Sequence, residues 1–159
     1  MSKEHKVTSY PAILAILLKE IRLERNIHQA QLAEYIGISP AGLAKVEHGK
    51  STLTMTTFLR ACSVLGIAAS SVMATAERYT QHFLNNGWAV LAEPQKFEND
   101  ELLQQANIFY SDRKTNLPTT GYLNQFNQFV SILNTPIIKR DNTVELAPVF
   151  YYVFGGWQA

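Results

Sequence analysis

The sequence predicts two parts of different fold class, an all-α N-terminal domain of five short helices and a small α+β C-terminal module. Two observations lead to this prediction. Apolar residues recur at three- and four-residue spacing over much of residues 11–86, which is typical of amphipathic helices. From residue 87 the composition changes, and 13 of the 17 aromatic residues lie between Phe83 and Trp157. With 159 residues, the chain has room for one ordinary domain or two small ones.

Capping and helix-breaking residues separate the five predicted helices. Ser and Thr side chains accept hydrogen bonds at a helix start, Pro suits the first turn, and Gly adopts the left-handed conformation that ends a helix. These signals predict helices over residues 11–25, 29–36, 40–48, 55–65 and 69–85. The residues that carry the signals are Pro11, Gly37, Ser39, Pro40, Gly49, Thr54 and Gly66.

The second part mixes extended and helical patterns. A strand is predicted near Pro94, a capped helix follows it, and the turn-like Arg140-Asp141-Asn142 lies between the two arms of a predicted hairpin. The end of the capped helix fits an extended strand equally well. The predicted elements are a strand over 88–92, a helix over 99–109, a helix over 122–133, and hairpin arms over 135–139 and 144–154.

Charge and cysteine content restrict the class of protein. Residues 1–80 hold nine Lys or Arg against six Asp or Glu, whereas residues 81–159 hold five against seven, so the first half favours an anionic partner. Cys62 is the only cysteine, which excludes an intrachain disulfide and suits a reducing cytoplasm. The apolar run over residues 12–18 is too short to cross a bilayer. We therefore expect a cytoplasmic protein with no membrane segment.

Residues 29–48 carry the strongest functional signal. Two short helices that cross steeply need a small residue where they approach, a residue that tolerates positive φ in the turn, and apolar groups behind the second helix. Ala33, Gly37 and the pair Leu43 and Val46 meet these three needs. The segment is therefore predicted to form a helix-turn-helix.

The sequence resembles the phage-repressor and Cro-like helix-turn-helix proteins, often called the XRE family, over about residues 13–73. The stretches that carry the resemblance are "QAQLAEYIGIS", "LAKVEHGK" and "TFLRACSVLGI", in this order and at matching spacing. The resemblance implies that the N-terminal part is a repressor-like five-helix domain that binds double-stranded DNA, with the helix over residues 39–48 in the major groove.

The resemblance also implies roles for individual residues. Gln29 matches a position that binds a backbone phosphate and braces the reading helix, although a solvent-exposed amide remains the alternative. Arg22 and Glu47 match a structural ion pair. Lys45 is the one long polar side chain at a groove-facing position, able to donate to guanine or to a phosphate, or else simply solvated. The expected DNA-binding residues are Gln29, Ser39, Pro40, Ala41, Lys45, Lys50, Ser51 and Thr52.

The sequence departs from the family pattern at the start of the reading helix, where Pro40 and Ala41 replace a polar pair. These two side chains can contact a thymine methyl, so specificity would depend on that contact, on one lysine, and on DNA shape and half-site spacing. His28 and Ala68 lack the capping oxygen usual before the second and fifth helices, which bears on stability alone.

Residues 148–154 are apolar on both faces of the predicted strand. A strand of this kind is buried in the core of its own chain, buried against a second subunit, or part of a small-molecule sensing pocket. The residues that would form a dimer interface are Phe150, Tyr152 and Phe154. The sequence shows no nucleophile–base pair, metal-ligand spacing or glycine-rich phosphate loop, so we expect no enzyme, metal or cofactor.

These observations predict a sequence-specific transcriptional regulator, a dimeric repressor that binds an inverted-repeat operator. Residues 1–10 would be a polar arm, residues 11–86 the DNA-binding domain with a long last helix, and residues 87–159 an aromatic-rich module for dimerisation or for binding an effector or a protein partner. The alternative is an antitoxin-like module, which binds a partner protein through the C-terminal half and controls its own promoter.

Overall fold

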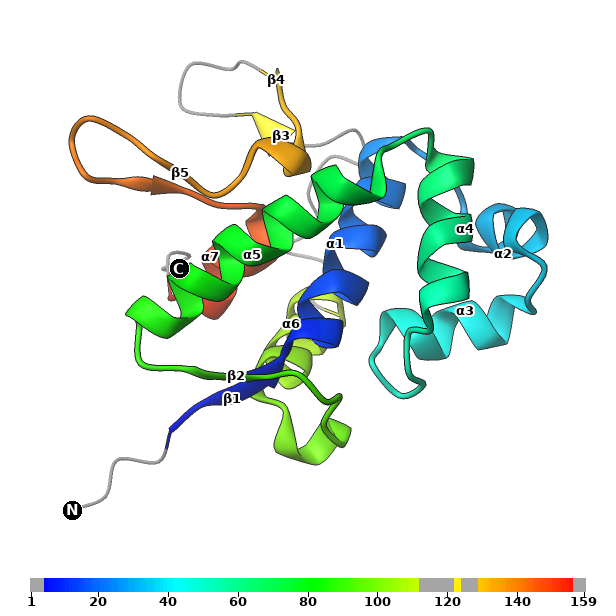
Figure 1. The fold of residues 1–159 in the computed structure, drawn as a ribbon, viewed down its shortest axis with the longest axis horizontal. Helices are drawn as coiled ribbons and strands as arrows, with labels where there is room; N and C mark the ends of the chain where they lie inside the picture. Colours follow the sequence, from blue (N-terminus) through cyan, green and yellow to red (C-terminus); the bar gives the residue numbers. More distant parts are fainter. Residues whose placement is uncertain (1–4, 112–121, 124–128, 156–159) are drawn as a thin grey trace.

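The structure is a computed structural model that describes residues 5–111, 122–123 and 129–155. It is mostly helical, with short two-stranded pairs (Figure 1). The helices are α1 (Tyr10–Glu24), α2 (Gln29–Ile36), α3 (Pro40–Glu47), α4 (Met55–Leu65), α5 (Ala69–Asn85), α6 (Glu101–Ser111) and α7 (Pro148–Val153). The strands are β1 (Val7–Ser9), β2 (Ala89–Leu91), β3 (Tyr122–Leu123), β4 (Phe129–Val130), β5 (Ile137–Ile138) and β6 (Val144–Glu145). Two 3-10 helices are η1 (Phe97–Asn99) and η3 (Ile132–Asn134).

Side-chain caps set the starts of three helices, α1, α3 and α4. The Ser9 hydroxyl accepts a hydrogen bond from the Ala12 N–H at 3.1 Å and starts α1. Ser39 and Thr54 cap α3 and α4 in the same way, satisfying N–H groups that have no partner within the helix. Left-handed glycines end α2 and α4, namely Gly37 and Gly66. His28 and Ala68 make no such side-chain cap before α2 and α5.

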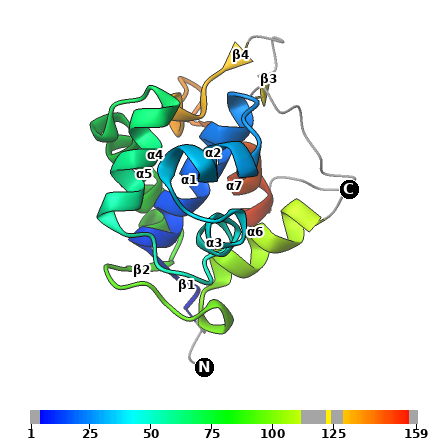
Figure 2. The ribbon, with the colours of Figure 1, turned by 90° about the vertical axis from the view of Figure 1, so that its right-hand side faces the viewer.

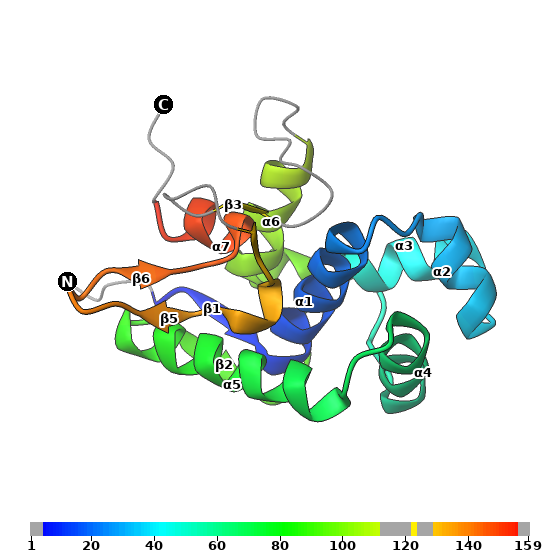
Figure 3. The same cartoon turned by 90° about the horizontal axis from the view of Figure 1, so that it is seen from above.

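Helix α1 lies at the centre of the molecule, between helices α2–α4 and the second part of the chain (Figures 1 and 3). It packs on α3, α4, α5 and α6 and on η3, and 11 of its 15 residues are buried. The sequence predicted a helix with one apolar face. The structure also buries four charged residues of α1, because neighbouring elements cover the polar side as well: Lys19, Glu20, Arg22 and Glu24.

The chain returns to its own beginning after α5. Strand β2 pairs in parallel with β1, with Val7 opposite Ala89 and Ser9 opposite Leu91 (Figure 1). Part of the segment expected to be a polar arm is thus a strand, in which Thr8 and Ser9 are buried. The Phe83–Trp88 ring contact, at 4.8 Å between centroids, packs the turn between α5 and β2. Residues 1–4 of the expected arm lie outside the described residues.

The predicted strand over residues 148–154 is wrong, because Pro148–Val153 form α7. Pro148 occupies the first helical turn, where its missing N–H costs nothing. The Ala147 N–H donates to the Tyr79 hydroxyl at 2.7 Å, and the Phe150 ring stacks on the Tyr79 ring at 3.9 Å. The apolar residues on both sides are accounted for by a short helix whose Val149, Phe150 and Val153 are buried.

The predicted helix over residues 122–133 is also wrong where the structure describes it. Strands β3 and β4 form an antiparallel pair, and η3 follows. The Ile132 N–H donates to the Glu24 carboxylate of α1 at 2.9 Å, so this N–H is not used in a continuous helix. The Ser131 hydroxyl donates to the same carboxylate at 3.2 Å. Residues 124–128 lie outside the described residues.

The predicted hairpin is present but shorter than expected. Strands β5 and β6 pair in antiparallel register, with Ile137 opposite Glu145. The predicted turn lies between them, and Asn142 adopts a positive φ of 65°. The second arm ends at Glu145 because the following residues enter the core and lead into α7. In the first arm, β5, the Ile138 side chain is 75% exposed.

The loop after α3 packs closely on α6. Gly49 has a φ of +75°, and a Cβ at this position would overlap the Leu103 side chain. Gly66 has a similar φ of +68°, but a Cβ there would meet nothing within 4 Å. The close approach at Gly49 therefore ties the end of α3 to the second part of the chain.

Replacing Gly49 with alanine is expected to destabilise the protein more than the same change at Gly66. A Cβ at positive φ costs about 1–2 kcal/mol at either site, and overlap with Leu103 adds about 1–3 kcal/mol at Gly49 alone. Urea unfolding of Gly49→Ala and Gly66→Ala measures the difference. Adding Leu103→Ala to both variants should shrink it, whereas equal losses for the two single variants would contradict the packing of this loop on α6.

Candidate nucleic-acid interface

Helices α2 and α3 are joined by a tight turn and lie on one side of the molecule with α4 (Figure 2). Gly37 is left-handed, and the Ile38 N–H donates to the Ala33 carbonyl at 3.0 Å, which closes the end of α2. Leu32, Ala33, Ile36 and Leu43 are buried behind the turn. The turn therefore has the small residue, the positive φ and the apolar backing that a helix-turn-helix needs.

The exposed face of α3 is short of long polar side chains. Ser39, Pro40, Ala41 and Lys45 are all exposed, while Leu43 and Glu47 are buried. Ala41 and Lys45 are four residues apart, so they lie on the same face of the helix. The Ser39 hydroxyl accepts from the Gly42 N–H at 2.9 Å, so its oxygen serves as the cap. Lys45 is thus the one long donor among these four residues.

Lys50, Ser51 and Thr52 are exposed in the loop that follows α3. Two N–H groups of this loop, those of Lys50 and Ser51, donate to the Lys45 carbonyl at 2.8 and 3.1 Å. The loop is therefore folded back on the end of α3. The loop carries one amine and two hydroxyls, those of Lys50, Ser51 and Thr52, directly after α3.

A buried ion pair holds α3 against α1. The Arg22 Nε donates to Glu47 Oε2 at 2.7 Å, and its Nη2 donates to Oε1 at 3.0 Å. Both side chains are at least nine-tenths buried. Arg22 Nη1 donates to the Ile27 carbonyl at 2.9 Å, and Gln29 Nε2 donates to Glu47 Oε1 at 2.8 Å. The structure therefore joins Arg22, Gln29 and Glu47 in one network that fixes α3 on α1 and α2.

Comparison with protein families matches residues 18–71 to the model described as helix-turn-helix. This match confirms the predicted resemblance of this segment to the XRE-family helix-turn-helix proteins. The matched segment contains all ten residues assigned above to DNA binding or to the ion pair. No curated protein and no solved structure matches the chain. The match supports a DNA-binding regulator, and domains of this family are typically not enzymes.

The aromatic residues predicted as a dimer interface lie within the chain itself. Phe150 is fully buried and has no surface to offer a second copy. Phe154 and Tyr152 are partly buried, with the Phe154 ring 4.8 Å from that of Phe83 and the Tyr152 ring 5.7 Å from that of Phe109. Of the three alternatives for this segment, the structure favours the core of its own chain.

A second polar cluster links α1 of the helix-turn-helix domain to α6, and no sequence pattern indicated it. The Tyr110 hydroxyl donates to Glu20 Oε1 at 2.8 Å, and the Lys19 ammonium lies 3.6 Å from the centre of the Tyr110 ring. Burial raises the pKa of Glu20 to about 7, although the hydrogen bond from Tyr110 opposes this rise. Burial lowers the pKa of Lys19.

The described residues contain neither a metal-binding cluster nor a single membrane-spanning helix. Within them, no three His, Cys, Asp or Glu side chains are grouped so as to hold a metal ion. No single helix of the described ranges is long and apolar enough to cross a membrane. Helices α4 and α5 reach that length and composition only together, and they are bent by 112° at the break between them.

Removing either partner of the Arg22–Glu47 pair is expected to cost more stability than removing both. Arg22→Met or Glu47→Leu alone leaves the other charge buried and unpaired, which lowers the free energy of unfolding by about 3–5 kcal/mol. The double variant removes both charges and should be more stable than either single one. Urea unfolding of the three variants tests this. Losses that simply add in the double variant would show that the two side chains are not coupled.

Glu20 is expected to make the protein less stable as the pH rises. Its pKa is about 7 in the folded state, against an ordinary carboxyl value of 4.5, so the folded state binds this proton more tightly. The resulting stabilisation is complete below pH 4.5 and is lost as the pH rises through 7, a change of about 3 kcal/mol.

Glu20→Gln keeps an oxygen that accepts the Tyr110 hydrogen bond and removes the titration. Urea unfolding of both proteins at pH 5 and pH 8 should show the variant gaining stability relative to the wild type at the higher pH. Other titrating groups are common to both proteins and cancel in this comparison. An unchanged difference between the two proteins at the two pH values would contradict the assignment.

Proposed function

We propose that the protein is a sequence-specific transcriptional regulator that places α3 in the major groove of DNA. The observation that carries this proposal is the division of α3 into two faces. One face is held by the buried network of Arg22, Gln29 and Glu47, and the other exposes Pro40, Ala41 and Lys45. A helix fixed on one side and free on the other can enter a groove in a defined orientation.

Base recognition by α3 would depend on few contacts. Lys45 can donate to guanine O6 or N7, and the Pro40 ring and Ala41 methyl can contact a thymine methyl. Lys50, Ser51 and Thr52 would bind phosphates, which position the protein without reading sequence. Gln29 would also contact a phosphate, through the polar groups that its bond to Glu47 leaves free. The remaining specificity would come from DNA shape and half-site spacing.

A dimer would supply that spacing. Two-fold pairing puts two reading helices about 34–36 Å apart along the DNA, so the operator would be an inverted repeat. We assign dimerisation to residues 87–159, through surfaces other than the buried Phe150. Repression is the proposed outcome because it requires only that the operator be occupied.

Selection of bound DNA from a random pool is the experiment that tests this function. We expect a short motif with two-fold symmetry and little information in each half-site. Binding to the selected DNA should weaken steeply with salt, because log K falls by about 0.9 for each phosphate neutralised. Failure to enrich any motif, together with a flat salt response, would rule out sequence-specific DNA binding.

Lysine variants are expected to separate base reading from phosphate binding. Lys45→Ala should change the ranking of operator variants, whereas Lys50→Ala should weaken all of them alike and reduce the salt slope by about 1. Arg140→Ala is the matched control, because it removes one exposed cation from the β5–β6 turn, far from α3 (Figures 1 and 3). Fluorescence anisotropy on a panel of operators measures both effects. An unchanged ranking for Lys45→Ala would mean that Lys45 does not read bases.

A further inference from the structure

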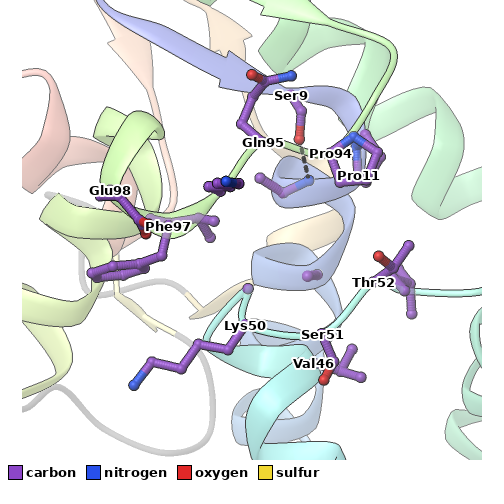
Figure 4. A pocket seen from close by; sticks show the side chains of 16 residues that line it. Ser9, Pro11, Val46, Lys50, Ser51, Thr52, Pro94, Gln95, Phe97 and Glu98 are labelled. Atoms are coloured by element: carbon purple, nitrogen blue, oxygen red, sulfur yellow. Dashed lines mark hydrogen bonds between the residues drawn. The ribbon is translucent and has the colours of Figure 1, made fainter.

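A hollow of about 520 Å³ lies between the loop after α3 and the segment that leads from β2 into η1 (Figure 4). Phe97, Glu98 and Lys50 lie along one side of it, and Pro11, Pro94 and Thr52 along the other. Sites for small organic molecules typically measure about 300–1,000 Å³. The hollow is therefore large enough for such a molecule. It lies between the helix-turn-helix domain and the second part of the chain.

Apolar side chains line the inner surface of this hollow. Ala12 and Ala15 come from the first turns of α1, and Leu103 comes from α6. All three side chains are buried. A larger residue at either alanine would occupy the space that the methyl groups leave open. Val46 and Leu53 extend the apolar lining toward the reading helix.

The rim of the hollow carries a positive charge. Lys50 and Lys96 line it, against one carboxylate, that of Glu98. Among the described residues, neither lysine ammonium makes an ion pair or a hydrogen bond. The Lys50 ammonium lies 5.9 Å from the Phe97 ring, which is a weak contact at an exposed site. Both amines are therefore available to a ligand.

We propose that this hollow is an effector site for a small organic anion with an apolar body. The body would lie on Ala12 and Ala15, and the acidic group would pair with Lys50 or Lys96. The charge on the rim favours an anion over a neutral or cationic ligand of the same shape. A ring or short alkyl chain fits the apolar inner surface.

The same site would couple the ligand to DNA binding, a step that rests on the proposed function. Lys50, Ser51 and Thr52 line the hollow and are also the residues proposed to bind phosphates. A bound anion would pair with Lys50, which is proposed to bind a DNA phosphate. Its bulk would also keep the loop away from the DNA backbone. The anion and DNA would therefore weaken each other's binding by the same factor.

Titration with 4-phenylbutyrate and octanoate tests the site without DNA. We expect shifts in the Ala12 and Ala15 methyl signals by NMR, with a dissociation constant of about 1 mM or tighter. The neutral alcohol 4-phenylbutanol should bind about two- to fivefold more weakly, and so should the acids to Lys50→Gln or Lys96→Gln. Arg140→Gln is the control of equal charge change and should bind as the wild type does.

Two results would overturn the effector site. One is the absence of any methyl shift at about 10 mM of either acid. The other is equal binding of acid and alcohol that neither lysine variant changes. Ala15→Leu fills the hollow and should abolish binding. Because a leucine at this buried position also disturbs the core, the test of the site is decided by the exposed Lys96→Gln variant.

The DNA arm of the experiment separates this inference from the proposed function. Adding 4-phenylbutyrate should weaken binding to the selected operator in the wild type and do so less in Lys96→Gln. Probe binding with no effect on DNA affinity would overturn the coupling. Probe binding by a protein that binds no DNA would overturn the proposed function and support the site.

Discussion

The arrangement of the whole molecule depends on the burial of helix α1 on nearly all sides. A surface helix keeps its polar residues in water and requires only an apolar stripe. Helix α1 has no such freedom, because α3 and α4 cover one part of it and α5, α6 and η3 cover the rest. Every charged group it buries must then have a partner, since an unpaired buried charge costs several kcal/mol.

Three of the four buried charges find a hydrogen-bond partner, each on a different element, and the fourth, Lys19, lies over the Tyr110 ring. Arg22 pairs with Glu47 of α3, Glu20 accepts from Tyr110 of α6, and Glu24 accepts from the backbone that starts η3. Apolar packing alone allows a helix to shift or rotate at little cost, whereas these bonds require particular positions of their partners. The polar residues of α1 therefore fix how α3 and the second part of the chain are placed relative to each other.

The sequence predicted the features that depend on neighbouring residues, such as the helix ends. Caps such as Ser39 and left-handed glycines such as Gly37 act within a few residues, and the structure places helix ends at both. The Arg22–Glu47 pair came from the family resemblance. One error concerns a short apolar run, residues 148–154, for which periodicity does not separate strand from helix. The other concerns residues 122–133, where the helical spacing of apolar residues did not produce a helix in the described part.

The contacts that decide those runs lie far away in the chain. The Tyr79 hydroxyl of α5 accepts a hydrogen bond from the N–H of Ala147, 68 residues later, and the Tyr79 ring packs on Phe150 of α7. Glu24 takes the N–H of Ile132, 108 residues later. No local pattern reports a partner at that separation. The same is true of the hollow beside Lys50, which exists only because residues 94–98 return to the end of α3.

A regulator built on such a central helix has few parts that can move cheaply. Shifting α3 would break the buried bonds of Glu47, and shifting α6 would displace Leu103 from Gly49 and Tyr110 from Glu20. The loop over residues 50–52 is different, because its side chains are exposed and make no ion pair or hydrogen bond among the described residues. Under the proposed function, control of DNA binding is least costly at this loop, where a ligand needs only to occupy side chains that are proposed to bind phosphates. A long-range conformational change is not required.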